Sequence, residues 1–190
     1  MGRFSNGLVI KKMDFVNTFT ELMKKRGYVL CDESAAELSY FVEQGGDWAA
    51  LAGEDYTDNP SHTSSDAAFI AKELNVPLFS VEVVDSDFAI LNRNGSEVIV
   101  GDGSGYGIEY APSADRAVWE LLLTNGTFED LMDFWENEEV FVEDALCSSA
   151  PLFGIEPPTL IVPDYRDFSE DSDNKNVTAL FFRKVLRIGS

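Results

Sequence analysis

Residues 78–101 read LFSVEVVDSDFAILNRNGSEVIVG and predict three short strands, at 78–84, 87–92 and 97–101. These runs are rich in Val, Ile, Leu and Phe, which favour extended backbone. Asn94-Gly95 lies between the second and third strands and is the strongest short-range signal for a hairpin. The segment therefore predicts antiparallel β-structure.

A second hairpin is expected earlier in the chain. Residues 37–43 (ELSYFVE) and 48–54 (WAALAGE) flank a four-residue connection that contains Gly45-Gly46. Trp48, Ala50 and Ala52 share one face of the second run, because side chains alternate along a strand. Two hairpins in one short chain favour a sheet that grows by antiparallel pairing.

A helix is expected before each hairpin, over residues 14–26 and 66–74. Both segments carry apolar side chains at the 3.6-residue period of an α-helix. Asp14 is the expected N-cap of the first helix, and Ser65 that of the second. The order of helix, hairpin, helix and hairpin suggests a duplication, although no repeat is visible residue by residue.

The remaining segments complete a prediction for a single domain over residues 1–190. Residues 1–11 are expected to be a loose lead-in, and residues 56–65 an exposed loop. Three helices, an acidic connection rich in Pro and Asp, and a final strand are expected over residues 113–123, 127–135, 139–149, 157–176 and 177–182. The predicted fold is α+β, with a mainly antiparallel sheet built from hairpins, backed by helices, and a more helical C-terminal third.

The charge of the chain is its most unusual property. Residues 27–174 contain thirty-two Asp and Glu against four Lys and Arg, a formal charge of −28, whereas both ends of the chain are basic. Aromatic and aliphatic residues are too frequent for a disordered acidic protein, so the acids are expected to cover a folded body. Such a surface excludes nucleic acid as a ligand and favours a cationic protein.

Three motifs resemble metal-binding, phosphate-binding or catalytic sites, but a structural role explains each of them better. Asp85-Ser86-Asp87 can hold Mg²⁺ or Mn²⁺ only if further ligands converge on it. The glycine-rich residues 101–107 lack the lysine of a phosphate-binding loop. His62 is the only histidine and lies in a polar segment without the fixed partners of a catalytic triad. No catalytic, metal-binding or cofactor-binding residue is therefore assigned.

Acidic side chains are instead predicted to bind a basic protein. The densest run lies between residues 129 and 144, where no base relieves the repulsion between carboxylates. The predicted partner-binding residues are Asp55, Asp58, Asp85, Asp87, Glu129, Asp130, Asp133, Glu136, Glu138, Glu139, Glu143 and Asp144. The oligomeric state is left open.

The expected location is the cytoplasm. The N-terminal residues contain no apolar run of the kind a secretion signal needs, and no segment approaches the length of a membrane span. Cys31 and Cys147 lie far apart in the sequence and are expected to be reduced thiols. A membrane is therefore not among the expected partners.

In its acidity, small size and helix-first order, the chain resembles immunity proteins of bacterial polymorphic toxin systems. The resemblance rests on two segments. One is 67–77 (AAFIAKELNVP) with the strand that leads into 84–87 (VDSD), and the other is 141–146 (FVEDAL) before 152–155 (LFGI). The resemblance implies a protein that neutralises a toxin such as a nuclease. It transfers no site residue to this chain.

Three other classes of function stay open. A DNA mimic would inhibit a DNA-binding protein, but it needs carboxylates spaced like phosphates over an elongated body. An enzyme would hold a metal between Asp85 and Asp87, with Asp102 as a further ligand. A structural module would carry its charge only for solubility.

Overall fold

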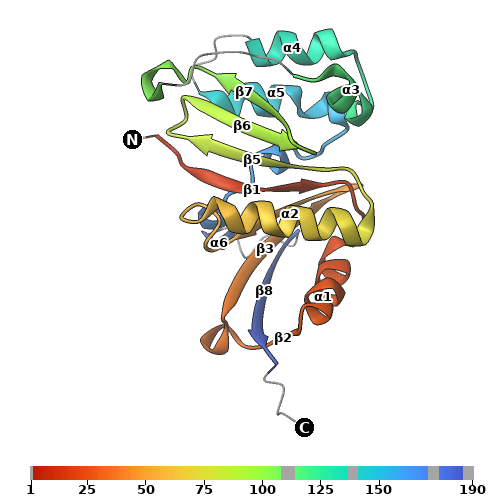
Figure 1. The fold of residues 1–190 in the computed structure, drawn as a ribbon, viewed down its shortest axis with the longest axis vertical. Coiled ribbons are helices and arrows are strands. Elements are labelled where there is room, and N and C mark those ends of the chain that lie inside the picture. The colour runs from red at the N-terminus through yellow and green to blue at the C-terminus, as the bar shows by residue number, and fades with distance from the viewer. Residues whose placement is uncertain (1, 108–113, 137–140, 171–175, 186–190) are drawn as a thin grey trace.

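The computed structural model describes residues 2–107, 114–136, 141–170 and 176–185, which build one eight-stranded sheet (Figure 1). The strands are β1 (Ser5–Ile10), β2 (Tyr28–Leu30), β3 (Leu38–Gly45), β4 (Trp48–Gly53), β5 (Leu78–Val84), β6 (Phe88–Arg93), β7 (Ser96–Gly101) and β8 (Val177–Lys184). Their order is β2-β8-β3-β4-β1-β5-β6-β7, and each pair of neighbours is antiparallel. The predicted α+β fold with its two hairpins is confirmed.

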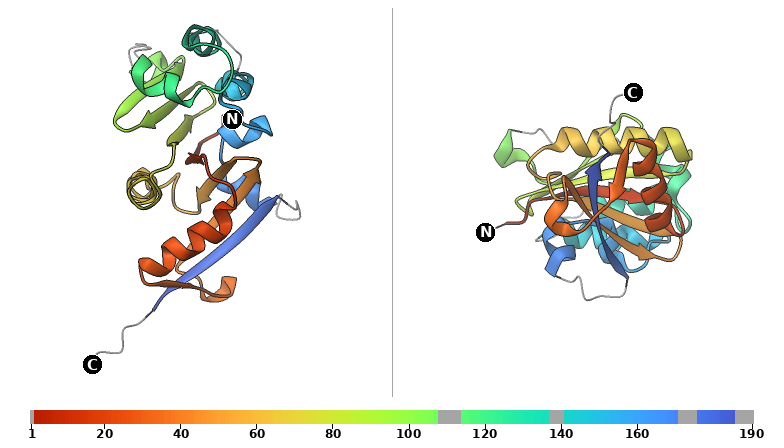
Figure 2. Two further views of the ribbon diagram at one scale, coloured as in Figure 1. Left: turned by 90° about the vertical axis from the view of Figure 1, so that its right-hand side faces the viewer. Right: turned by 90° about the horizontal axis from the view of Figure 1, so that it is seen from below.

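Helices cover both faces of the sheet (Figure 2). The α-helices are α1 (Phe15–Lys25), α2 (Pro60–Leu74), α3 (Arg116–Trp119), α4 (Phe128–Glu136), α5 (Val142–Phe153) and α6 (Tyr165–Glu170). Short 3₁₀ turns are η1 (Glu33–Ala35), η2 (Ser104–Tyr106), η3 (Glu120–Leu122) and η4 (Pro158–Ile161). α1 and α2 pack on one face, and α3 to α6 pack on the other.

Each face of the sheet has its own hydrophobic core. On the first face, Phe15 and Phe19 of α1 pack against Tyr40 and Phe182 of the strands. The other core contains the three tryptophans, which are at most 1 % exposed. The tryptophans therefore belong to the interior of the protein.

The expected loose lead-in over residues 1–11 is wrong, because Ser5–Ile10 form the central strand β1. Leu8 pairs with Leu51 of β4 on one side and with Ser80 of β5 on the other. All six residues of β1 are buried. A strand covered on both faces need not alternate between polar and apolar residues, so its sequence carries no period of two. β1 joins the two helix–hairpin segments into one sheet.

The expected exposed loop over residues 56–65 is also wrong. Helix α2 begins at Pro60, whose fixed φ suits the first turn of a helix, so Ser65 is not its cap. Tyr56 is fully buried, and its hydroxyl donates to Asp66 Oδ2 over 2.7 Å. The polar composition of this segment hid a helical turn and a core tyrosine.

Helix α1 is confirmed, but its predicted cap is not. Asp14 has a φ of 52° and makes no capping hydrogen bond to the helix. The first helical amide is satisfied from a distant strand instead, because Phe15 N donates to Gln44 Oε1 over 3.0 Å. A side chain from the neighbouring hairpin thus replaces the local cap.

The C-terminal third is helical, as expected, with shifted boundaries. The start predicted at Ser113 lies outside the described residues, and α3 begins at Arg116. Helix α4 has the predicted capping pair, since Thr127 N donates to Asp130 Oδ2 over 2.7 Å. Helix α5 continues through Pro151 to Phe153, where Thr124 N binds the carbonyl of Leu152 over 2.7 Å.

The expected acidic connection over residues 157–176 contains structure of its own. It includes η4 and α6, and residues 171–175 lie outside the described part of the chain. Leu160, Ile161 and Phe168 are buried in the core that holds the tryptophans. The segment therefore packs against the sheet, because its apolar side chains outweigh its prolines and acids.

Candidate functional site

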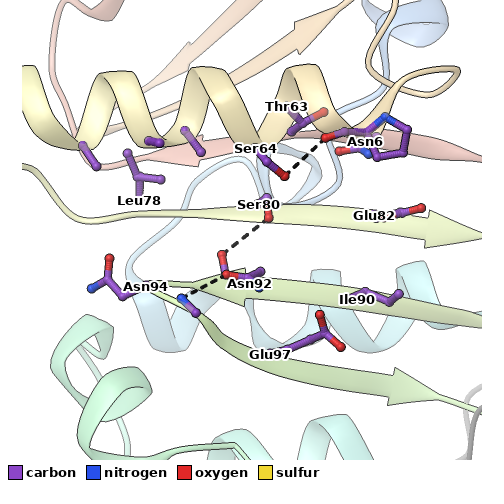
Figure 3. A pocket seen from close by; sticks show the side chains of 15 residues that line it. Asn6, Thr63, Ser64, Leu78, Ser80, Glu82, Ile90, Asn92, Asn94 and Glu97 are labelled. Carbon is purple, nitrogen blue, oxygen red and sulfur yellow. Dashed lines mark hydrogen bonds between the residues drawn. The ribbon is translucent and has the colours of Figure 1, made fainter.

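A groove of about 520 Å³ lies between helix α2 and the face of strands β5, β6 and β7 (Figure 3). We call it the α2 groove. Its helix wall is made of small side chains, Ser64, Ala67, Ala68 and Ala71, and its floor consists of Ser80, Glu82, Ile90, Asn92 and Glu97. The opposite face of these strands carries Phe79, Val81 and Leu91, which belong to the core. Strand alternation therefore aims the polar floor residues toward the helix.

The strand register places the floor residues in two rows. Glu82 of β5 is paired with Asn6 of β1 on one side and with Ile90 of β6 on the other. Asn92 is paired with Ser80 and with Glu97 in the second row. Glu82 and Glu97 therefore lie in different rows, on the two sides of β6, and both face the groove.

Two polar side chains are buried at the end of the groove near the start of α2. Asn6 is 4 % exposed, and Thr63 is 2 % exposed. Among the described residues, the Thr63 hydroxyl oxygen is buried without a hydrogen-bond partner. A buried polar atom without a partner costs about 1–3 kcal/mol. The fold thus keeps polar groups here at a cost to stability.

The groove is electrostatically one-sided. Burial raises the pKa of Glu82, and the nearby charge of Glu97 adds to this rise. Within the described residues, neither carboxylate has a hydrogen bond or an ion pair. None of the fifteen residues that line the groove in these ranges is Lys, Arg or His. The uncompensated negative charge would be relieved by a cation.

The turn after β5 carries two of the predicted partner-binding residues. Asp85 and Ser86 have φ values of 52° and 61°, and Asp87 N donates to the carbonyl of Val84 over 3.1 Å. These features define a type I′ turn, which tolerates Asp at positive φ. Asp85 follows Glu82 by three residues, which is about 10 Å along an extended strand. The turn therefore lies beside the groove.

The start of helix α5 is fixed to this turn. The buried Ser86 hydroxyl donates to Glu143 Oε1 over 2.8 Å, and Val142 N donates to the carbonyl of Ser86 over 3.0 Å. The Asp85 carboxylate accepts a hydrogen bond from the Tyr106 hydroxyl over 2.8 Å. The structure therefore brings the Asp85–Asp87 turn together with the acidic first turn of α5, which the sequence could not establish.

Asp55 and Asp58 lie just before Pro60, which lines the same groove. Figure 1 shows the loop before α2 and the β5–β6 turn at the same end of the sheet. Asp55 is hydrogen-bonded to the ring of His62, whereas Asp58 is exposed. We call the six carboxylates at this end the acidic rim; they are Asp55, Asp58, Asp85, Asp87, Glu143 and Asp144.

The predicted residues on α4 do not belong to this rim. Glu129 is ion-paired to Arg116, and that hydrogen bond lowers the pKa of Glu129. Asp130 caps its own helix through Thr127, which lowers the pKa of Asp130.

The two other α4 residues of the prediction face solvent. Asp133 and Glu136 are exposed, and Glu138 and Glu139 lie outside the described residues. Within the described residues, Glu129 and Asp130 serve local structure, whereas Glu143 and Asp144 belong to the rim.

The alternatives based on metal or nucleophilic chemistry gain no geometry from the fold. Across residues 2–107, 114–136, 141–170 and 176–185, no three His, Cys, Asp or Glu side chains are placed to hold a metal ion. His62 contacts Asp55 and Asn59, and these contacts include no nucleophile. Within the same ranges, no helix combines the length and apolar character needed to cross a bilayer.

Sequence reasoning missed the residues of the groove, namely Asn6, Thr63, Glu82 and Glu97. Each was assigned to a lead-in, a loop or the polar face of a strand, where a polar side chain needs no special explanation. One signal was present in the sequence. Three successive strands carry polar side chains at paired positions, at Ser80, Asn92 and Glu97. Helix α2 turns that polar face into a groove.

Comparisons with protein-family models, with curated proteins and with solved structures found no match to this chain. Its function must therefore be argued from the site itself.

Proposed function

We propose that this protein binds a cationic protein and neutralises it, as an immunity protein or inhibitor of a toxin such as a nuclease. The observation that carries the proposal is the excess of thirty-two acids over four bases within residues 27–174 of a chain with two hydrophobic cores. A folded body keeps these carboxylates at fixed positions, which a disordered acidic tail cannot do. Fixed negative charge is what a basic surface can recognise specifically.

The four bases in this segment leave most of the acidity uncompensated. Arg116 is ion-paired to Glu129 and lies 3.7 Å from Glu120. Arg93 and Arg166 donate to backbone carbonyls, so their described hydrogen bonds neutralise no carboxylate. Lys72 is exposed on α2. The positive charge available between residues 27 and 174 is therefore small and partly used.

The chemistry of a nuclease explains why such a surface would inhibit it. An enzyme that grips phosphates carries a basic cleft, and a rigid acidic surface competes for that cleft. Electrostatic steering raises association rates to about 10⁸–10⁹ M⁻¹ s⁻¹ at low salt. The acidic rim offers carboxylates from two loops and the first turn of α5 at one end of the sheet, which suits a concave basic partner.

A DNA mimic is the second candidate, favoured by one observation. The sheet twists along an elongated body (Figure 1), and a long body can present carboxylates over several phosphate spacings. Both candidates require a basic protein partner. They differ in what the partner normally binds, so competition by duplex DNA for the captured protein would favour the mimic.

The first test is capture from the native lysate with tagged protein at about 50 mM salt, where screening is weak. We expect one stoichiometric basic protein that salt releases and whose toxic or nuclease activity is blocked by an equimolar amount of this chain. Scattered basic proteins, all released together by modest salt and none of them inhibited, would refute the proposal.

A pair of matched variants would place the contact. Asp87→Asn with Asp144→Asn removes two charges from the rim, and Asp133→Asn with Glu136→Gln removes two charges from α4. All four side chains are exposed, so both pairs change the net charge equally with little effect on packing. We expect the rim pair to slow association more than the α4 pair does. Equal effects would mean that only the total charge matters.

A further inference from the structure

The α2 groove has the features of a pocket for a basic side chain. Its volume of about 520 Å³ falls within the range of small-ligand sites, about 300–1,000 Å³. One wall consists of Ala67, Ala68 and Ala71, and the floor includes Ile90. Figure 3 shows Glu82 and Glu97 on the same floor, on two strands that β6 separates. The lining thus combines an apolar track with carboxylates.

This combination matches the chemistry of Lys and Arg. Both side chains have an aliphatic stem that packs along apolar surface and a charged end that seeks carboxylates. A fully apolar ligand would leave Glu82 buried without a counter-charge, and an anion would be repelled by Glu82 and Glu97. A cation with an aliphatic stem fits both parts of the groove.

The buried polar groups provide a second, independent observation. Thr63 is only 2 % exposed, and its hydroxyl lacks a hydrogen-bond partner among the described residues. Asn6 is also buried, and its register partner is Glu82 itself. Both residues line the groove. The side-chain oxygen of Asn6 can accept a hydrogen bond from an ammonium or a guanidinium group.

We propose that the α2 groove receives a Lys or Arg side chain of the cationic partner, with its charged end between Glu82 and Glu97 and its stem along the alanines of α2. This inference rests on the proposed function, because it names the part of the partner that is recognised. The acidic rim lies at the end of the sheet where α2 begins. The rim would therefore attract the partner, and the groove would fix its position.

The test uses the whole chain and a defined probe, the peptide acetyl-Gly-Lys-Gly-Arg-Gly-amide. Its control replaces both basic residues by norleucine, which keeps an aliphatic stem and removes the charge. Binding is followed by the backbone amide signals in NMR. We expect the basic peptide to shift signals of α2, β5 and β6, and the norleucine peptide to leave them unchanged.

Three variants separate the groove from the general field of the protein. Glu82→Gln with Glu97→Gln should weaken binding of the basic peptide by about tenfold or more. Ala68→Leu should weaken it without any change in charge, because a larger side chain fills the groove. Asp133→Asn with Glu136→Gln also removes two negative charges, but from α4. This pair should leave the affinity for the peptide within about twofold of that of the unchanged protein.

The outcomes distinguish this inference from the proposed function. Equal weakening by the two charge pairs, or no effect of Ala68→Leu, would overturn the groove as a specific site. If spermidine binds in the groove and the peptide does not, the ligand of the groove is a small amine and not a protein side chain. Groove binding of the peptide without a captured toxin would keep the pocket and refute the toxin partner. If a toxin is captured and inhibited, and its affinity is the same for the protein with Glu82→Gln and Glu97→Gln, the pocket alone is refuted.

Discussion

Tyr56→Phe is expected to destabilise the protein, because it removes a hydroxyl group that donates a hydrogen bond to the buried carboxylate of Asp66. Asp66 of α2 is 4 % exposed and accepts hydrogen bonds from Tyr56 over 2.7 Å and from Tyr40 over 3.0 Å. Arg26 completes the cluster as an ion pair and lies over the ring of Phe69, 4.7 Å from its centroid. The cluster ties α1, α2, β3 and the segment before α2 together.

The expected loss follows from the charge and the burial of the acceptor. A hydrogen bond to a charged group contributes about 1.5–3 kcal/mol, and Phe preserves the packing of the ring. For a chain of this length, each kcal/mol corresponds to about 2–4 °C in Tm, so we expect a fall of about 3–12 °C. Urea unfolding followed by circular dichroism should give a lower midpoint with an unchanged slope.

Tyr106→Phe is the matched control for this measurement. The Tyr106 hydroxyl also donates to an aspartate, Asp85, over 2.8 Å, but Tyr106 is 46 % exposed. Water can replace that hydrogen bond, so its urea midpoint should stay within experimental error of the unchanged protein. If Tyr56→Phe shifts the midpoint no more than Tyr106→Phe does, the argument that burial gives the Asp66 cluster its strength is wrong.

Three further changes test other parts of the fold. Gly7→Ala should cost about 1–3 kcal/mol in urea unfolding, because the added Cβ would lie 2.5 Å from Pro163 Cγ in the crowded centre of the sheet. Stability should fall as the pH rises above about 10, since burial and the charge of a nearby aspartate raise the pKa values of Tyr40 and Tyr56 in the folded state only; replacing both by Phe should flatten this alkaline decline. Glu82→Gln should raise the urea midpoint at pH 7 and lose this advantage below the ordinary carboxyl pKa of about 4.3, because a raised pKa in the folded state favours the protonated protein.

The hairpins could be predicted because their signals are local. Asn94 and Gly95 both have positive φ, as the hairpin required, and the strands on either side of them pair antiparallel. Helices α1 and α4 likewise followed from apolar side chains at helical spacing and, for α4, from the Thr127–Asp130 pair. Elements that satisfy themselves locally leave a pattern in the sequence.

The central strand and the groove could not be predicted because they depend on contacts between distant segments. Ser5–Ile10 is extended only because β4 and β5 pair with it on both sides. The position of Glu82 matters only because α2 lies beside its strand, and no local pattern specifies that packing. The ion pair between Arg116 and Glu129 was unforeseen for a related reason, since the two side chains come close enough to pair only in the folded chain.

The position of β8 has a consequence for how the protein is made. Residues 177–184 fill the gap between β2 and β3, two strands that leave the ribosome about 140 residues earlier. Until β8 has been synthesised, β3 presents a row of unpaired backbone groups, and such an edge invites pairing with other nascent chains. The sheet can therefore close only after residues 177–184 have been synthesised. During that interval the carboxylates already synthesised would also keep neighbouring chains apart, because like charges repel.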